Sequence, residues 1–240
     1  MTMNNIKSYF TTLTVITAAF LVLKSEIVVA TIPTGPERWT SPCGAMSTTG
    51  DPPPIPVRPS FEIVTDMMIQ ILEGRDYSAD LQNKCAYDRI KSGRLIAMLD
   101  SEPLEGYERV KELSEEDLET ALDNVTKAHI DNYRILSIHL VYIEEMRFDE
   151  VYEQDAYTKD IRKLENKLFG VLCLMNEDIS NSRVDINHIS RDAMDTDLRT
   201  PSTRMDRFVR DYVTVKETTK LLDNFIILYR AIKDNMSSSK

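Results

Sequence analysis

Apolar residues recur in steps of three and four along four stretches of the chain, and this spacing marks one face of an α-helix. The clearest stretch runs from Tyr157 to Met175, where the apolar residues form a continuous seam. Cys173 follows Leu172 by about 100° around the helix axis and lies off this seam. Its thiol can therefore reach a segment outside the bundle. The pattern predicts an all-α protein organised around this helix.

The four apolar stretches carry signals for where each helix begins and ends. Ser60 and Ser114 can cap the first two helices, and acidic residues follow Ser114 in the first turn. Thr200 and Pro201 are typical of a helix start. Gly74 either ends the first helix or lies inside a longer one, and the pattern leaves both open. With the longer form, the expected helices cover residues 60–90, 114–147, 156–177 and 201–234.

The connections between these helices indicate their order in space. Roughly ten residues join the second helix to the third, which suffices only for antiparallel neighbours. The other two connections have roughly twenty residues or more and can climb back along a helix of about 35 Å. We therefore expect a long-chain four-helix bundle, up-up-down-down with two long crossover connections. An up-down-up-down bundle with decorated loops is the alternative.

Residues 1–30 differ from the rest of the chain. Leu13 to Leu23 is an uncharged run of 11 residues, which is too short to span a membrane. Small residues at Val28 and Ala30 precede Thr31, so this segment is predicted to be a signal peptide that is removed before Thr31. An uncleaved signal anchor is the alternative. The prediction places the protein outside the cell, as a secreted protein.

Residues 31–59 are rich in proline, so no regular element is expected there. This segment is predicted to be an extended arm that carries Cys43. The four-helix domain then occupies residues 60–235. The last residues, 236–240, are predicted to be a disordered tail.

Composition excludes several classes of function. The formal net charge of −10 argues against nucleic-acid binding through a general electrostatic attraction. The histidines, His129, His139 and His188, are not accompanied by a zinc-binding or catalytic motif, and no phosphate-binding or dinucleotide fingerprint occurs. We therefore expect no enzyme activity, no metal and no cofactor. Cys43, Cys85 and Cys173 would form one disulfide and leave one thiol in an oxidising compartment.

Two short runs carry a resemblance to a known family. Asn132–Ile135 (Asn-Tyr-Arg-Ile) lies in the second helix, and Val171–Leu174 (Val-Leu-Cys-Leu) lies near the end of the third. With the order of an arm followed by four helices, the chain resembles the interleukin-6 family of helical cytokines, in the branch of leukaemia inhibitory factor, oncostatin M and ciliary neurotrophic factor. The resemblance implies a secreted monomer that bridges transmembrane type I cytokine receptor chains and activates JAK-STAT signalling, without inserting into the membrane.

The resemblance also implies a pairing of the cysteines. In that branch, a cysteine of the arm pairs with one in the third helix, which corresponds here to Cys43 and Cys173. A second pair joins a cysteine between the first two helices to one early in the fourth helix. Cys85 matches the first of these, but Val215 stands where its partner is expected. Cys85 is therefore expected to be a free cysteine.

The family binds one receptor through a Phe-x-x-Lys motif at the start of the fourth helix. Phe208 and Asp211 stand at the matching positions, so the lysine is replaced by an aspartate. This charge reversal would repel an acidic receptor site. Either the partner has changed, or Arg207 or Arg210 supplies the cation. Phe208 also fits the apolar seam, so a place in the core is the alternative for this residue.

A second receptor contact of the family lies on the first and third helices. By position, Asn166, Phe169 and Gly170 correspond to it. Phe169 lies off the seam of its helix, where a large apolar side chain points to an interaction surface, unless the arm covers it.

Asn124 and Asn235 begin glycosylation sequons of a secreted glycoprotein. As an alternative function, the chain could be a secreted helical carrier of an apolar ligand. A carrier would show a large internal cavity with a polar lining group.

Overall fold

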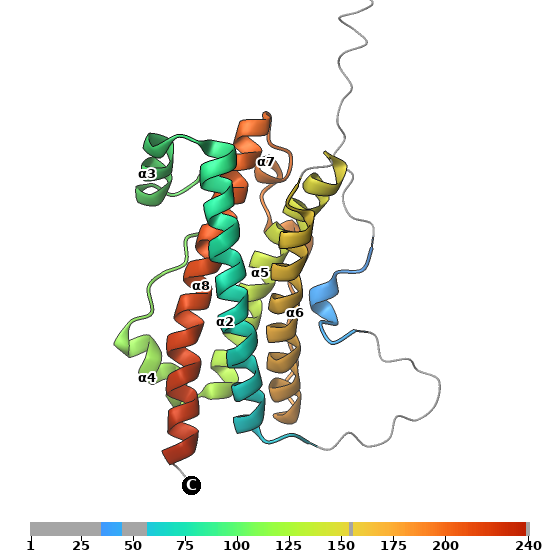
Figure 1. The fold of residues 1–240 in the computed structure, drawn as a ribbon. Coiled ribbons are helices and arrows are strands. Elements are labelled where there is room, and N and C mark those ends of the chain that lie inside the picture. Colours follow the sequence, from blue (N-terminus) through green and yellow to red (C-terminus); the bar gives the residue numbers. More distant parts are fainter. Residues whose placement is uncertain (1–34, 45–56, 154–155, 239–240) are drawn as a thin grey trace, which may run out of the picture. The chain divides into compact units, whose positions relative to one another are not determined.

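The computed structural model describes residues 35–44, 57–153 and 156–238. All the regular elements in these ranges are helices, and they contain no strand. The four longest are α2 (Ser60–Lys84), α5 (Val125–Tyr152), α6 (Thr158–Asn181) and α8 (Arg204–Ser238). They lie side by side (Figure 1). The prediction of an all-α helical bundle is therefore confirmed.

Shorter elements occupy the connections. The π-helix η2 continues α2, α3 lies near the end of the bundle where α2 ends, and α4 lies near the other end (Figure 1). The bounds are η1 Arg38–Thr40, η2 Cys85–Ile90, α3 Gly93–Ser101, α4 Glu115–Asp123, η3 Arg191–Ala193 and α7 Thr196–Arg199. None of the described helices combines the length and the hydropathy that a membrane span requires. The expected signal peptide, residues 1–30, lies outside the described residues.

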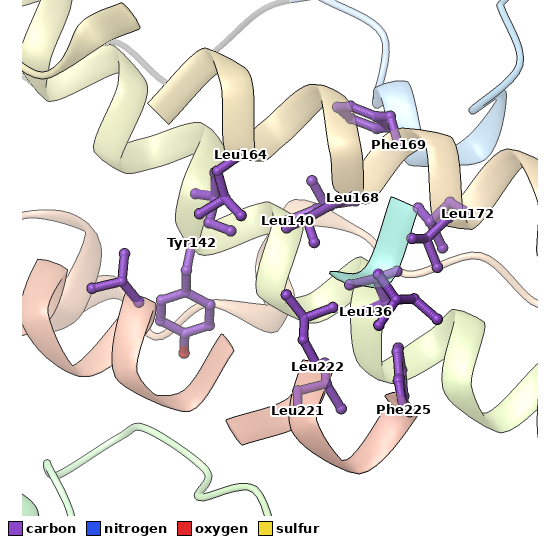
Figure 2. Packing of buried hydrophobic residues seen from close by; sticks show 14 of the residues in the cluster. Leu136, Leu140, Tyr142, Leu164, Leu168, Phe169, Leu172, Leu221, Leu222 and Phe225 are labelled. Carbon is purple, nitrogen blue, oxygen red and sulfur yellow. The ribbon is translucent and has the colours of Figure 1, made fainter. Parts of the chain in front are cut away.

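The predicted apolar seams form the core of the bundle. Leu136 and Leu140 of α5 point toward Leu164 and Leu168 of α6 and toward Leu222 of α8 (Figure 2). All five side chains are buried. At about 25 cal/mol per Å² of apolar area, each leucine that is removed from water contributes roughly 2 kcal/mol to folding. The described residues from Pro36 onward form one compact unit around this core.

Polar contacts at both ends fix how α2 meets its neighbours. Arg58, two residues before α2, forms an ion pair with Glu177 near the end of α6 (3.3 Å). At the other end of α2, Lys84 Nζ lies 2.7 Å from Asp160 in the first turn of α6. Likewise, Lys233 near the end of α8 lies over the ring of Phe61 at the start of α2. In each pair, residues from the beginning of one helix meet residues from the end of the other.

Contacts of α5 likewise join the beginning of one helix to the end of another. His129 in its second turn lies 2.9 Å from Asp178 near the end of α6. Asn132 donates to the hydroxyl of Tyr229 in the second half of α8 (3.2 Å). At the far end of α5, Asp149 accepts a hydrogen bond from Arg210, in the second turn of α8 (2.6 Å).

Several predicted boundaries need correction. The second predicted helix, 114–147, is two helices, because the backbone turns out of the helical region at Asn124 (φ −143°, ψ 78°). The side-chain oxygen Oδ1 of Asn124 accepts from the Lys127 N–H and caps α5 (3.0 Å). The second of these helices runs on to Tyr152. Ser114 does cap α4, through a reciprocal capping box with Asp117.

The first and fourth helices also differ in detail. Gly74 lies inside α2, so the longer of the two forms left open is the right one. α8 begins at Arg204 because the Thr203 hydroxyl accepts from the Asp206 N–H (3.1 Å). At its other end α8 includes Met236 to Ser238, so the predicted disordered tail is wrong for these residues.

Candidate functional site

The N-terminal arm is fastened to α6. The structure has the disulfide that the resemblance implies, between Cys43 and Cys173, with sulfurs 2.08 Å apart. The third cysteine, Cys85, is free and buried in η2. Burial raises the pKa of its thiol to about 12. A thiol with this pKa stays protonated and unreactive at neutral pH.

Hydrogen bonds also hold the described part of the arm before Cys43 against the bundle. Trp39 is fully buried, and its indole N–H donates to the carbonyl of Ile189 in the connection before α8 (2.6 Å). The Tyr133 hydroxyl of α5 donates to the Trp39 carbonyl. The Glu37 carboxylate accepts from the backbone N–H of Arg191 (2.8 Å). Residues 36–44 therefore link α5, α6 and the segment between α6 and α8.

The arm covers the predicted anchor on α6. Phe169 is turned away from the core leucines and toward the arm (Figure 2). The guanidinium of Arg38 lies 4.1 Å from the centre of its ring, and only 6% of Phe169 is exposed. Phe169 is therefore not an open apolar anchor, which corrects that expectation. Its predicted companions differ, because Asn166 is exposed whereas Gly170 is half-buried against Gln70.

The predicted contact at the start of α8 is mostly internal. Asp211 is fully buried and accepts from Arg89 (3.2 Å) and from Arg210 Nε (3.0 Å). Arg89 also binds the buried carboxylate of Glu150. Arg207 and Arg210 are 3% and 1% exposed. These three predicted receptor residues, Arg207, Arg210 and Asp211, therefore do not present a surface, because buried charges require the partners they have found here.

Phe208 lies at the edge of this network and is half-buried. Its ring centre lies 4.8 Å from the guanidinium of Arg89, 5.3 Å from that of Arg204 and 5.1 Å from that of Arg207. Cation–π contacts of this kind hold an aromatic ring in one orientation. Part of the ring is still accessible, so Phe208 fits both of the roles that its sequence position allowed.

Two exposed apolar side chains adjoin this edge in the chain. Tyr152 at the end of α5 is 73% exposed, and Met205 at the start of α8 is 45% exposed. Glu153 joins the two elements through ion pairs with Arg204 (3.3 Å) and Arg207 (3.0 Å). We call Tyr152, Glu153, Arg204, Met205 and Phe208 the α5–α8 corner. Sequence reasoning missed Tyr152 because it ended the second helix at residue 147 and assigned a polar break to the residues after it.

The remaining predicted positions lie on the surface. Asn124 and Asn235, the two sequon asparagines, are both exposed. The side-chain oxygen Oδ1 of Asn124 caps α5, whereas a glycan would be attached to the side-chain nitrogen Nδ2. Among the described residues, no three His, Cys, Asp or Glu side chains are grouped as metal ligands would be.

An open pocket of about 390 Å³ lies between α5, α8 and the residues that lead into α4. His139 in its wall is buried, and its Nδ1 lies 2.9 Å from the hydroxyl of Thr218. Burial lowers the pKa of His139 to about 4, so the imidazole is neutral at physiological pH. The apolar part of the lining consists of Val110, Leu113, Ile135, Ile138, Leu221, Phe225 and Leu228.

Comparison with protein-family models, with curated proteins and with solved structures finds no match to this chain.

Proposed function

We propose that the chain is a secreted, monomeric four-helix cytokine of the interleukin-6 type, which bridges type I receptor chains and activates JAK-STAT signalling. The fold we propose for it is up-up-down-down. The end-to-end contacts support this order, because α2 and α5 each meet both α6 and α8 with opposite polarity. Two helices that are both antiparallel to the same partners run parallel to each other, which requires two long crossovers.

The observation that carries the proposal is the disulfide between Cys43 and Cys173. It fastens an arm before the first long helix to the third long helix, as the resemblance implies. Residues 36–44 of the arm pack on the helical domain, and Trp39 is fully buried there, which supports a structural role for this part of the arm. A protein of this design has no chemistry of its own and acts through the surfaces that it leaves exposed.

The receptor contact is proposed to be the α5–α8 corner. It is adjacent to the position of the family motif, and it has an exposed aromatic ring, an exposed methionine and a rim of opposite charges. Aromatic anchors within a polar rim are typical of binding hot spots. In this proposal Tyr152 and Phe208 anchor the receptor instead of the lysine that the motif lacks. The buried Asp211 holds Arg89, whose guanidinium lies over the ring of Phe208.

The test begins with expression of the full chain in cultured animal cells and purification from the medium. We expect the purified protein to raise STAT phosphorylation in cells that carry type I cytokine receptors. Tyr152→Ala combined with Met205→Ala should reduce the response at least tenfold, because hot-spot truncation costs about 2 kcal/mol or more. Ile227→Ala, which truncates a side chain that is 52% exposed elsewhere on α8, is the matched control.

A protein that stays inside the cells would contradict secretion. A secreted protein that captures no receptor chain from a panel of type I ectodomains would contradict the cytokine role. Equal losses in the control and in the corner variant would show that the corner is not the contact.

The open pocket supports a second candidate function, that of a carrier for an apolar ligand. Its volume falls in the range of small-molecule sites, and the neutral His139 supplies a polar group in an apolar wall. The pocket is open to solvent, whereas a carrier was expected to have a large internal cavity. Titration with the neutral fluorescent probe N-phenyl-1-naphthylamine tests this role. Leu228→Trp should abolish saturable binding if the pocket is the site.

A further inference from the structure

A group of cations gathers where the arm meets α5 and α6, in a chain whose net charge is −10. It consists of Arg38 from the arm, Arg147 from α5, and Lys159 and Arg162 from α6. We call these four residues the arm–α6 cation cluster. Glu165, the carboxylate at its centre, is buried, with only 3% of its side chain exposed.

Two of the guanidiniums share this one carboxylate. Arg38 lies 3.3 Å from one oxygen of Glu165, and Arg147 Nε donates to the other oxygen at 3.2 Å. Each guanidinium also lies over an aromatic ring, Arg38 over Phe169 at 4.1 Å and Arg147 over Phe148 at 4.5 Å. The stacking fixes both planes and leaves a net positive charge, because one carboxylate cannot neutralise two cations.

Glu165 accepts from only a few of the N–H groups of Arg38 and Arg147. A guanidinium has five N–H donors, and among the described residues Glu165 is the hydrogen-bonding or ion-pair partner of both side chains. About half of the Arg38 side chain is exposed to solvent. The free N–H groups of these oriented cations therefore form a fork that fits the oxygens of a sulfate, a phosphate or a carboxylate.

The cluster continues along α6 toward its first turn. Lys159 and Arg162 are exposed, and within the described residues neither side chain has an ion-pair or hydrogen-bonding partner. They are three residues apart, and Arg162 is three residues before Glu165, so all three lie on adjoining faces of the helix. From Lys159 to Phe169 the helix rises about 15 Å, which gives the cations a linear arrangement.

We propose that the arm–α6 cation cluster binds a sulfated polysaccharide of the cell surface or extracellular matrix. A linear polyanion matches a row of cations about 15 Å long. An acidic protein partner is less favoured, because such contacts are usually anchored by apolar side chains. The large apolar residues that are exposed in the described structure include none from α6 or from residues 36–44. Arg38 covers the one aromatic ring, Phe169, that could have been an anchor.

The overall acidity of the chain does not oppose such binding at short range. At physiological ionic strength the Debye length is about 8 Å, so the distant carboxylates are largely screened. Bound polyanions release counterions when cations replace them, and binding therefore weakens steeply with salt. We expect affinity for heparin that falls as sodium chloride rises.

The test measures binding of the purified full chain to immobilised heparin over a series of salt concentrations. Soluble heparin, fully desulfated heparin and poly-glutamate are the competitors, and soluble heparin should compete far better than the other two. The double variant Lys159→Glu and Arg162→Glu should lose at least tenfold in affinity at 0.1 M salt. The slope of log Kd against log salt should fall by roughly two, one for each lost cation. Arg38→Gln should give a smaller loss of the same kind.

The matched control is Lys111→Glu with Arg134→Glu, which makes the same change of charge at two exposed cations beside the open pocket. Circular dichroism verifies that all variants are folded. Binding that survives in the cluster variant, or that falls equally in the control, overturns the site. Stronger competition by poly-glutamate than by soluble heparin would assign the cluster to an acidic protein segment instead. The heparin measurement needs no receptor, so its outcome is separate from that of the signalling assay.

Discussion

Asp211 shows why one residue departs from the motif to which its position corresponds. The side chain is fully buried between Arg89 and Arg210, and both guanidiniums hydrogen-bond to its carboxylate. A lysine here would remove the carboxylate that both guanidiniums bind and would place a third cation beside them, with Glu150 and Asp149 as the remaining anions. The neighbours of Asp211 within the fold therefore account for an acidic residue at this position.

Asp211→Lys should destabilise the protein and should not restore a family-like receptor contact. Breaking a buried ion pair costs about 3–5 kcal/mol, because the remaining charges stay buried without a partner. The midpoint of urea unfolding measures the loss. Asp234→Lys introduces the same charge change at an exposed position of the same helix, and it should leave the midpoint within experimental error. A stable Asp211→Lys protein would contradict the importance of the network.

Glu145 gives stability a dependence on pH. Burial, assisted by the nearby Asp149 carboxylate, raises the pKa of Glu145 to about 7. The folded state therefore holds a proton that the unfolded state releases near pH 4.3, and the free energy of unfolding falls as pH rises between these values. Glu145→Gln imitates the protonated form. It should match the parent at pH 4.5 and exceed it at pH 8, by up to about 3 kcal/mol.

Thermal or urea unfolding of the Glu145→Gln variant and of the parent at pH 4.5 and pH 8 measures this difference in stability. The buried His139 contributes a slope of the opposite sign between about pH 6.5 and 4, so the comparison uses the difference between variant and parent. His139 is the same in both proteins, and its contribution cancels. Glu119→Gln at an exposed position of α4 should show no such pH dependence.

At the scale of the elements, apolar spacing predicts a helix most reliably when only one face of that helix is buried. From Ile161 to Met175 the predicted seam of α6 is buried, whereas Tyr157, which precedes the helix, is half-buried. Leu172 and Phe169 are buried as well, although they lie off that seam, because α6 also meets neighbouring helices and the arm. The break at Asn124 escapes prediction, since asparagine inside a continuing apolar pattern carries no unambiguous stop signal. The short helix α3 escapes because it is stabilised by packing on the bundle more than by its own sequence.

The disulfide is the main constraint on the arm. Cys43→Ser with Cys173→Ser should lower the free energy of unfolding by about 4–5 kcal/mol, because the bond closes a loop of 130 residues in the unfolded chain. Urea unfolding of the double variant and of the parent measures the difference. Cys85→Ser replaces a buried thiol that forms no disulfide, so it should cost less. Peptide mapping that joins Cys85 to either partner would contradict this pairing.

At the scale of the whole molecule, the order of the helices can be tested directly. The amines of Lys84 and Lys163 both bind Asp160, at 2.7 Å and 3.4 Å. A short amine-reactive cross-linker should therefore join these two lysines in the native protein. In an up-down-up-down bundle α2 and α6 would be parallel, and these residues would lie about 30 Å apart. Lys84 ends α2, whereas Lys233 of α8 lies over Phe61 at the beginning of α2, so these two lysines should remain unlinked.

The candidate surfaces were harder to predict than the bundle. The sequence indicates which segments form amphipathic helices. It does not show which charged side chains of different helices will form ion pairs. Arg89, Glu150 and Asp211 are far apart in the chain, and their burial depends on packing between η2, α5 and α8. Phe169 was correctly placed off the seam, yet its cover by Arg38 follows from the path of the arm. Surfaces formed by distant segments need coordinates.

The chain contains one tryptophan, and it lies on the arm, fully enclosed between the bundle and the carbonyl of Ile189. Its fluorescence therefore reports on a single event, the attachment of the arm. Release of residues 36–44 would expose the indole to water and shift its emission to longer wavelength. The protein thus carries a built-in optical probe, with which detachment of the arm can be timed separately from melting of the helices.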